Sequence, residues 1–195
     1  MQTVSEILRA RLLLRVSRPY YWLVTLWLYL IPTGGHRALF SSIPFWLGIA
    51  YCTLPLNLMC YLMNDLADIL TDKENSRKGG DFLGAKEDEV TLRALVPIAV
   101  LMQLPFLAAF ALLCGAITWK WFFAVFAVNW LYNFGPRLSA AYAPLDLVCP
   151  CGYILVTPLS CWLNSLAYPP MPSWIHAFCL VLRTQVKYTS NRGMR

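Results

Sequence analysis

The sequence predicts an all-α protein that crosses a membrane several times as a bundle of about six helices. Of its 195 residues, 58% are hydrophobic and only 13% are charged, about half the charged fraction of a typical soluble domain. The charges are also unevenly spaced: Arg37 is the only one between Arg18 and Asp65, and Asp146 is the only one in residues 138–182. Such stretches are long enough to cross the bilayer hydrocarbon, which requires about 20 apolar residues per helix.

Six apolar segments are candidate spans, and Gly, Pro, charged or Asn-Ser turn residues separate them. They cover residues 20–33, 43–63, 94–115, 120–136, 142–163 and 171–184. Prolines fall inside or near several segments, but neighbouring helices in a bilayer satisfy the backbone groups that a proline leaves free. Each segment is therefore expected to be helical.

The basic residues predict the orientation of the chain. With the amino terminus in the cytoplasm, every Lys and Arg except Arg37 and Lys120 lies on the cytoplasmic side, which is the side that carries the basic excess in membrane proteins. We therefore expect a multi-pass integral membrane protein whose amino terminus and Asp-rich loop are cytoplasmic. These basic flanks and anionic membrane lipids account for the net charge of +6, so nucleic acid is not an expected partner.

The first 18 residues combine four arginines with leucine and isoleucine. Two interpretations are equally favoured: a helix that lies in the head-group layer, or a basic flank of the first span. The seven cysteines lie almost entirely within the spans, where they serve as small apolar residues. Cys149 and Cys151 form the only close pair, and with both histidines remote in sequence a metal or redox site there is not favoured.

The most informative motif follows the second span. In a helix, Asp65, Asp68 and Asp72 lie within an arc of about 60°, with Asn64 on their flank. Carboxylates on one stripe repel each other, and ionisable groups at the edge of an apolar span mark a functional site. A divalent cation would relieve the repulsion, and oxygen ligands without interleaved His or Cys favour Mg²⁺ over Zn²⁺.

The residues after this row extend the same interpretation. Mg²⁺ commonly completes its coordination with substrate phosphates, and Arg77 and Lys78 supply positive charge suited to phosphate oxygens. The pattern therefore predicts a site for Mg²⁺ and a diphosphate. The alternative is a solvated acidic loop paired with neighbouring Lys and Arg, which we favour for residues 81–93 but not for residues 64–72.

These residues carry a family resemblance. Asn64-Asp65-x-x-Asp68-x-x-x-Asp72 resembles the first aspartate-rich motif of UbiA-type intramembrane prenyltransferases. The resemblance covers about residues 9–185, and other segments share it: Arg18-Pro19 before the first span, the stretch with Asn75, Arg77, Lys78 and Gly79, and the tyrosine-plus-basic segment from Tyr132 to Arg137. In the last segment Pro136 stands where the family often has lysine, so the basic contribution falls to Arg137.

The resemblance implies a nine-helix fold around a central cavity, of which residues 1–185 would form an incomplete domain of about six spans, followed by a divergent polar tail at 186–195. It also implies Mg²⁺-dependent transfer of an isoprenyl group from an isoprenyl diphosphate to an aromatic or otherwise lipophilic acceptor. On this basis the metal-binding and catalytic residues would be Asp65, Asp68 and Asp72, and the diphosphate contacts would be Asn64, Arg77, Lys78 and Arg137. The pattern predicts neither the acceptor nor the oligomeric state.

The second aspartate motif of the family is expected after the sixth span. Leu182-Arg183-Thr184-Gln185 resembles its lead-in, but no acidic residue follows. We therefore expect a shortened form of a longer prenyltransferase with little activity by itself. The main alternative is a catalytically inactive membrane protein, derived from a prenyltransferase, that binds ligands or partners. A cation transporter or membrane scaffold ranks third, because only Asp146 supplies acidity in another span.

Overall fold

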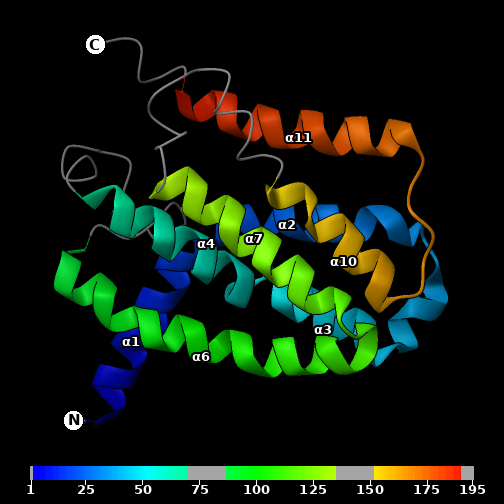
Figure 1. The fold of residues 1–195 in the computed structure, drawn as a ribbon. Helices are drawn as coiled ribbons and strands as arrows, with labels where there is room; N and C mark the ends of the chain where they lie inside the picture. Colours follow the sequence, from blue (N-terminus) through cyan, green and yellow to red (C-terminus); the bar gives the residue numbers. More distant parts are fainter. Residues whose placement is uncertain (1, 70–86, 135–151, 190–195) are drawn as a thin grey trace.

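The structure, a computed structural model, describes residues 2–69, 87–134 and 152–189, and the side chains of residues 8–69, 87–134 and 152–182. Within these ranges every regular element is helical (Figure 1), which confirms the all-α class. The elements are α1 (Gln2–Ser17), α2 (Pro19–Leu30), the 3₁₀ helices η1 (Ile31–Thr33) and η2 (Arg37–Ser41), α3 (Ile43–Cys52), α4 (Leu54–Ala67), α6 (Glu89–Cys114), α7 (Ile117–Asn133), α10 (Val156–Leu163) and α11 (Met171–Thr189).

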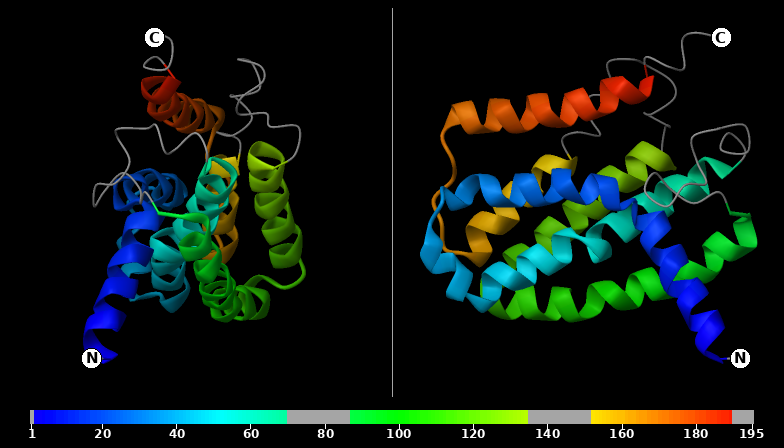
Figure 2. Two further views of the ribbon diagram at one scale, coloured as in Figure 1. Left: turned by 90° about the vertical axis from the view of Figure 1, so that its left-hand side faces the viewer. Right: turned by 180° about the vertical axis from the view of Figure 1, so that it is seen from behind.

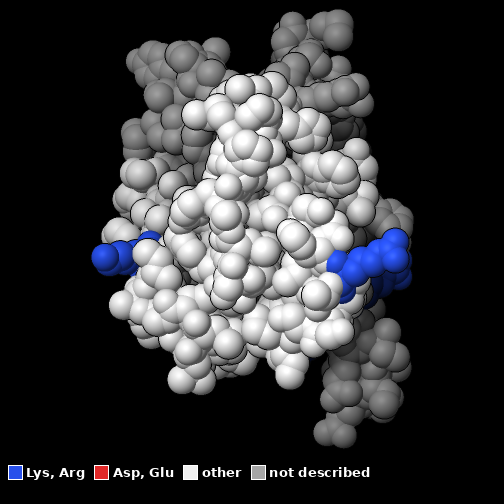
Figure 3. All heavy atoms as spheres, turned by 90° about the vertical axis from the view of Figure 1, so that its right-hand side faces the viewer, with Lys and Arg blue, Asp and Glu red and all other residues white. Residues whose placement is uncertain are grey.

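The bundle helices alternate in direction along the chain, with α3 and α4 running the same way as one stretch (Figures 1 and 2). The start of α2, the end of α4, the start of α6 and the end of α7 consequently lie at one end of the bundle, which we call the polar end. The opposite end carries η1, η2 and the turn between α6 and α7. Figure 3 views this opposite end: basic side chains lie at two margins, and no acidic side chain is visible among the described residues.

Two helical stretches are long and apolar enough to cross a membrane: Ile43–Ala67, which combines α3 and α4, and Glu89–Cys114, which is α6. Gly152–Leu163 and Met171–Leu182 are apolar but shorter. Only 22% of the most apolar part of α6 is buried inside the bundle, and soluble proteins rarely expose so large an apolar surface. The fold thus supports a membrane protein through two helices, and the expected six spans stay a prediction.

The second predicted span is two helices and not one. The chain turns at Thr53, where φ is −89° and ψ is −112°, and Pro55 follows in the first turn of α4. Proline has no N–H, so carbonyls around such a break need other donors. The fully buried Asn57 donates from Nδ2 to the carbonyls of Cys52 and Thr53, at 2.8 Å each, and Thr25 Oγ1 donates to Cys52 O at 2.6 Å.

Helix α6 supports the same break from the other side. Gln103 donates from Nε2 to Pro55 O at 2.9 Å and to Ala99 O at 3.1 Å, and its Oε1 accepts a hydrogen bond from Tyr51 at 3.0 Å. This buried amide joins α3, α4 and α6 at one point, so the break is held from both sides.

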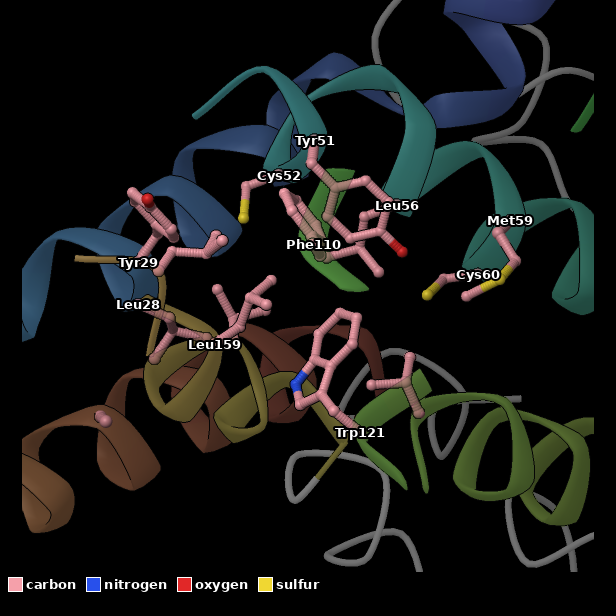
Figure 4. Packing of buried hydrophobic residues seen from close by; sticks show 14 of the residues in the cluster. Leu28, Tyr29, Tyr51, Cys52, Leu56, Met59, Cys60, Phe110, Trp121 and Leu159 are labelled. Carbon is pink, nitrogen blue, oxygen red and sulfur yellow. The ribbon is translucent and has the colours of Figure 1, made fainter. Parts of the chain in front are cut away.

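An aromatic core joins α3, α6 and α7 beyond the break (Figure 4). The ring of Tyr51 lies 5.3 Å from that of Phe110 and 5.9 Å from that of Trp121, both edge-on. Trp121 also donates to Leu155 O at 2.6 Å, which ties α7 to the start of α10. Offset and edge-on arrangements are the favourable ones for aromatic pairs, so this cluster fixes the far half of the bundle.

Helix α1 is separate from α2 and packs against α4. Val16 of α1 and Leu58 and Leu62 of α4 belong to a second buried cluster, to which Leu92 and Leu95 of α6 contribute. This packing holds α1 on the polar half of α4. Leu8 and Leu14 are exposed, and the two interpretations of the amino-terminal segment both stay open.

Candidate functional site

The polar residues of α4 share one face of the helix. Successive polar residues on this face are three or four positions apart, except for one adjacent pair, and such intervals place side chains on one stripe of a helix. The stripe consists of Asn57, Tyr61, the adjacent Asn64 and Asp65, and Asp68. Asp65 is only 2% exposed, and Asp68 occupies the carboxy-terminal cap of the helix. The charged residues of this stripe therefore extend from the buried interior to the polar end of the bundle.

Arg18 reaches this stripe from the junction between α1 and α2. Its backbone is left-handed, with φ of 51° and ψ of 76°, a conformation that is strained for a non-glycine residue and disfavours continuation of a helix into Pro19. The resulting turn directs the side chain onto α4. Arg18 Nη2 donates to Asp65 Oδ1 at 2.5 Å and to Asn64 Oδ1 at 3.0 Å.

Tyr61 covers the guanidinium of Arg18. The guanidinium carbon lies 4.5 Å from the centre of the Tyr61 ring, within the range of cation–π attraction. The hydroxyl groups of Tyr153 and Tyr61 share a hydrogen bond of 2.7 Å, and the ring of Tyr21 packs on that of Tyr61 at 5.3 Å. Arg18 is consequently held between a carboxylate and an aromatic ring, and only 4% of it is exposed.

Asn64 joins the stripe to α7. Its Nδ2 donates to Asp68 Oδ2 and to Asn133 Oδ1, both at 3.2 Å. Asn133 is itself fixed by a hydrogen bond of 2.9 Å from its Nδ2 to Asn129 O. The side-chain amide of Asn64 thus orients the Asp68 carboxylate through its N–H group, and its carbonyl oxygen accepts a hydrogen bond from Arg18.

The electrostatics of this network combine two carboxylates with one guanidinium inside the bundle. The Arg18–Asp65 pair is almost fully buried, and removal of one member of such a pair is strongly destabilising. A second ion pair, Arg15 with Glu87 at 3.5 Å, lies nearer the surface between α1 and the segment before α6. The network therefore fixes one oxygen of the Asp65 carboxylate in place against Arg18.

The structure brings together three of the predicted site residues, Asn64, Asp65 and Asp68. The other four predicted residues, Asp72, Arg77, Lys78 and Arg137, lie outside the described residues. Among the residues that are described, no group of three or more His, Cys, Asp or Glu side chains is placed to hold a metal ion. Magnesium binding accordingly stays a prediction.

Four members of the network were not predicted from the sequence as site residues: Arg18, Tyr61, Asn133 and Tyr153. A local signal existed for Asn133, because Asn129 and Asn133 stand one helical turn apart in an apolar segment. A signal also existed for Arg18, which is the last charge before a long uncharged stretch. Tyr153 lies 92 residues from Tyr61, and no local pattern indicates that contact.

The chain is similar to lycopene elongase/hydratase from Corynebacterium glutamicum, represented by a protein of strain ATCC 13032 and by a second protein of the same species. Each is 34% identical over 103 residues, which cover 51% of this chain and 34% of the relative. The match therefore spans about a third of the length of these curated relatives. No family model and no solved structure matches the chain. The similarity and the apolar helices together support a membrane function related to lipids or isoprenoids.

Proposed function

We propose that this chain acts as a membrane prenyltransferase, which binds an isoprenyl diphosphate with Mg²⁺ at the polar end and transfers the isoprenyl group to a lipophilic acceptor. The observation that carries the proposal is the buried network of Arg18, Asn64, Asp65 and Asp68 at the end of an apolar bundle. The relatives are named for lycopene, and a hydrocarbon acceptor of that kind suits a chain whose helices are mostly apolar.

The described donors fit Mg²⁺ in their chemistry. Asp65 and Asp68 offer carboxylate oxygens from adjacent turns, and Mg²⁺ is usually held by one or two protein carboxylates with the remaining positions left to water and substrate phosphates. By the sequence pattern, Asp72 would be a third ligand, and Arg77, Lys78 and Arg137 would contact the diphosphate. When bound, the metal would supply Lewis-acid stabilisation of the departing diphosphate.

The residues of the chain would prepare this site in two ways. Asn64 holds one oxygen of Asp68, so the carboxylate keeps one orientation, and Arg18 places a fixed positive charge where water is largely excluded. Preorganised charge of this kind favours a reaction in which negative charge develops on a leaving group. In the proposed transfer, the allylic C–O bond breaks with its electron pair on the diphosphate, a bond forms to the acceptor, and the acceptor releases a proton.

One observation favours a second candidate, a membrane protein that binds ligands or partners without catalysis. The Asp65 carboxylate is already paired with Arg18, and the Asn64 amide links Asp68 to α7. A network closed in this way would also serve to join α1, α2, α4 and α7. In that case the carboxylates would be structural.

The decisive test measures retention of a radiolabelled isoprenyl diphosphate by the purified chain in detergent, with and without Mg²⁺. The proposal predicts retention that requires Mg²⁺ and that falls at least tenfold in Asp68→Asn. Asp88→Asn is the matched control, because it makes the same charge change at an exposed residue outside the network, and it should retain the ligand fully.

Transfer to an added lipophilic acceptor is measured on the same samples. Equal retention by the native chain and Asp68→Asn would refute the carboxylate site. Mg²⁺-dependent retention without any transfer would favour the non-catalytic candidate.

A further inference from the structure

A chain of hydrogen bonds that ends on the Asp68 carboxylate begins in α7. Asn133, the last residue of that helix, is only 4% exposed. It donates from Nδ2 to Asn129 O at 2.9 Å, and its Oδ1 accepts from Asn64 Nδ2 at 3.2 Å. Asn64 Nδ2 also donates to Asp68 Oδ2 at 3.2 Å. A buried amide of α7 is therefore linked to a carboxylate of α4 through one intermediate side chain.

The two ends of this chain fix the direction of each hydrogen bond within it. The backbone carbonyl of Asn129 can only accept, and the Arg18 guanidinium, which donates to Asn64 Oδ1 at 3.0 Å, can only donate. A reversed Asn133 amide would turn its oxygen toward the carbonyl of Asn129. A reversed Asn64 amide would turn its N–H groups toward Arg18. Each amide therefore has one orientation, and Asn64 directs an N–H at Asp68 Oδ2.

Asn133 supplies the part of this orientation that Arg18 does not supply. Arg18 holds only the oxygen of the Asn64 amide, and a side chain held at one atom can still turn about its χ angles. Asn133 holds the nitrogen. With both atoms held, the second N–H of that nitrogen points at Asp68, which stands one helical turn beyond Asn64. Without Asn133, this N–H would lose its fixed direction.

The hydrogen bond from Asn64 engages one of the two oxygens of the Asp68 carboxylate. Oδ2 accepts the bond, so at most Oδ1 remains for a cation. Asp65 follows the same pattern, because its Oδ1 accepts from Arg18. A cation that binds both oxygens of one carboxylate would therefore have to displace a hydrogen bond at either aspartate.

This arrangement distinguishes between two common divalent cations. Ca²⁺ takes about six to eight oxygen ligands in flexible geometry and can bind both oxygens of one carboxylate. Mg²⁺ demands octahedral geometry, uses one or two carboxylates and leaves other positions to water and substrate phosphates. A carboxylate that offers a single oxygen suits Mg²⁺ and deprives Ca²⁺ of a bidentate ligand. Preference for the smaller cation thus depends on the hydrogen bond between Asn64 and Asp68.

We propose that Asn133 is a specificity-determining residue for the metal, because it directs Asn64 onto Oδ2 of Asp68 and thereby favours Mg²⁺ over Ca²⁺ at the polar end. The metal part of this inference rests on the proposed function. The orientation of Asn64 by Asn133 does not, since it depends only on hydrogen bonds among described residues. The two parts are therefore tested separately.

The metal part is tested by titrating Mg²⁺ and Ca²⁺ separately against retention of a radiolabelled isoprenyl diphosphate by the purified chain in detergent. The readout is the ratio of the two half-saturating concentrations, Ca²⁺ to Mg²⁺. The native chain should give a ratio well above one, and Asn133→Leu should lower this ratio about fivefold or more, because Asp68 can then offer both oxygens to Ca²⁺. A general loss of structure would weaken both metals alike and leave the ratio unchanged.

Asn129→Leu is the matched control for the metal titration. It makes the same substitution one turn earlier in α7 and keeps the backbone carbonyl that accepts from Asn133, so its ratio should equal that of the native chain. Asn133→Ala replaces Asn133→Leu if the leucine variant is not monodisperse by size-exclusion chromatography. An unchanged ratio in the Asn133 variant, or an equal fall in Asn129→Leu, would overturn the selectivity role.

The orientation part is measured without metal or diphosphate, by NMR of the side-chain amides in a chain labelled with ¹⁵N-asparagine. The Asn64 signal is identified by its absence in Asn64→Ser. Both N–H groups of Asn64 Nδ2 are hydrogen-bonded in the native chain, so their exchange with water should be slow, and Asn133→Leu should accelerate it. Unchanged exchange would overturn the inference whether or not the diphosphate binds.

The combined outcomes separate this inference from the proposed function. Mg²⁺-dependent retention by the native chain, together with an unaltered metal ratio in Asn133→Leu, would count against the inference alone. Retention that needs no divalent cation would count against the proposed function, and the metal part of the inference would fall with it. Accelerated exchange in Asn133→Leu would in that case still establish Asn133 as the residue that orients Asn64.

Discussion

At the scale of single residues, Arg18 has a strained backbone conformation and also forms a buried ion pair. Its left-handed φ of 51° is unfavourable by about 1–3 kcal/mol for a non-glycine residue, and the contacts of its side chain with Asp65, Asn64 and Tyr61 stabilise that conformation. Backbone and side chain therefore depend on each other, and the junction between α1 and α2 depends on α4.

Replacement of Arg18 by methionine is expected to lower the free energy of unfolding by about 3–5 kcal/mol, because it removes the guanidinium from a buried carboxylate. The double variant Arg18→Met/Asp65→Leu should be more stable than the single variant, since it removes both charges. Reversible unfolding in mixed micelles measures both. A double variant less stable than Arg18→Met would show that the pair does not act as a unit.

Gly48 shows how a missing side chain positions a large one. A β-carbon at this residue would lie far inside van der Waals contact with the ring of Tyr29. The hydroxyl of Tyr29 donates to Phe45 O of α3 at 3.2 Å. Gly48→Ala should therefore lower the free energy of unfolding by about 1–3 kcal/mol through overpacking. Thermal unfolding measures this loss of stability. The same Gly48→Ala change should destabilise the Tyr29→Leu variant less than it destabilises the native chain, because the tyrosine ring is then absent.

At the scale of elements, the buried amide of Asn57 is one of the groups that hold the break between α3 and α4. Asn57→Leu is expected to lower the free energy of unfolding by about 1–3 kcal/mol, because the carbonyls of Cys52 and Thr53 lose a donor in an apolar interior. Hydrogen exchange of the amides in residues 53–57 should accelerate. Met63→Leu, which lies in α4 more than two turns beyond the break, is the control and should leave that exchange unchanged.

The start of α6 should respond to pH. Asp88 caps the helix by accepting from the Thr91 backbone N–H at 2.8 Å and from its hydroxyl at 3.2 Å, and these bonds lower the pKa of Asp88 from its ordinary 3.8. The cap therefore stabilises the helix at pH values above 3.8 and is lost as the pH falls below that value. The amide shift of Thr91 by NMR should follow this loss, whereas Asp88→Asn should keep a cap that does not titrate.

The helices were predictable because apolar runs extend over whole elements, as the match between α6 (Glu89–Cys114) and the expected segment 94–115 shows. The break at Thr53 was not, because hydropathy is the same on both sides of a backbone turn. In the site, Asn64, Asp65 and Asp68 were predictable because they stand on adjacent turns of one helix. Arg18 lies 47 residues from Asp65, so their contact arises only when α1 and α2 pack against α4.

At the scale of the whole molecule, the start of α6, which Asp88 caps, lies at the polar end, and η2, which begins at Arg37, lies at the opposite end (Figure 1). If the bundle spans a membrane as the sequence predicts, these residues lie on opposite sides of it. Arg37→Cys should then react with a membrane-impermeant maleimide applied to intact cells, and Asp88→Cys should react only after the membrane is opened, each compared with the native cysteines. Equal reaction of both in intact cells would contradict the predicted orientation.

Helix α4 is enclosed on every side along its first half, since all residues from Pro55 to Leu62 are buried. No position there can vary freely, because each substitution meets the polar stripe or the apolar core. In a library that substitutes every position of the chain, tolerated changes should accordingly be rarest in this segment and commonest along the outward side of α6. An alignment of homologous sequences should show the same pattern, with α4 as the segment that varies least.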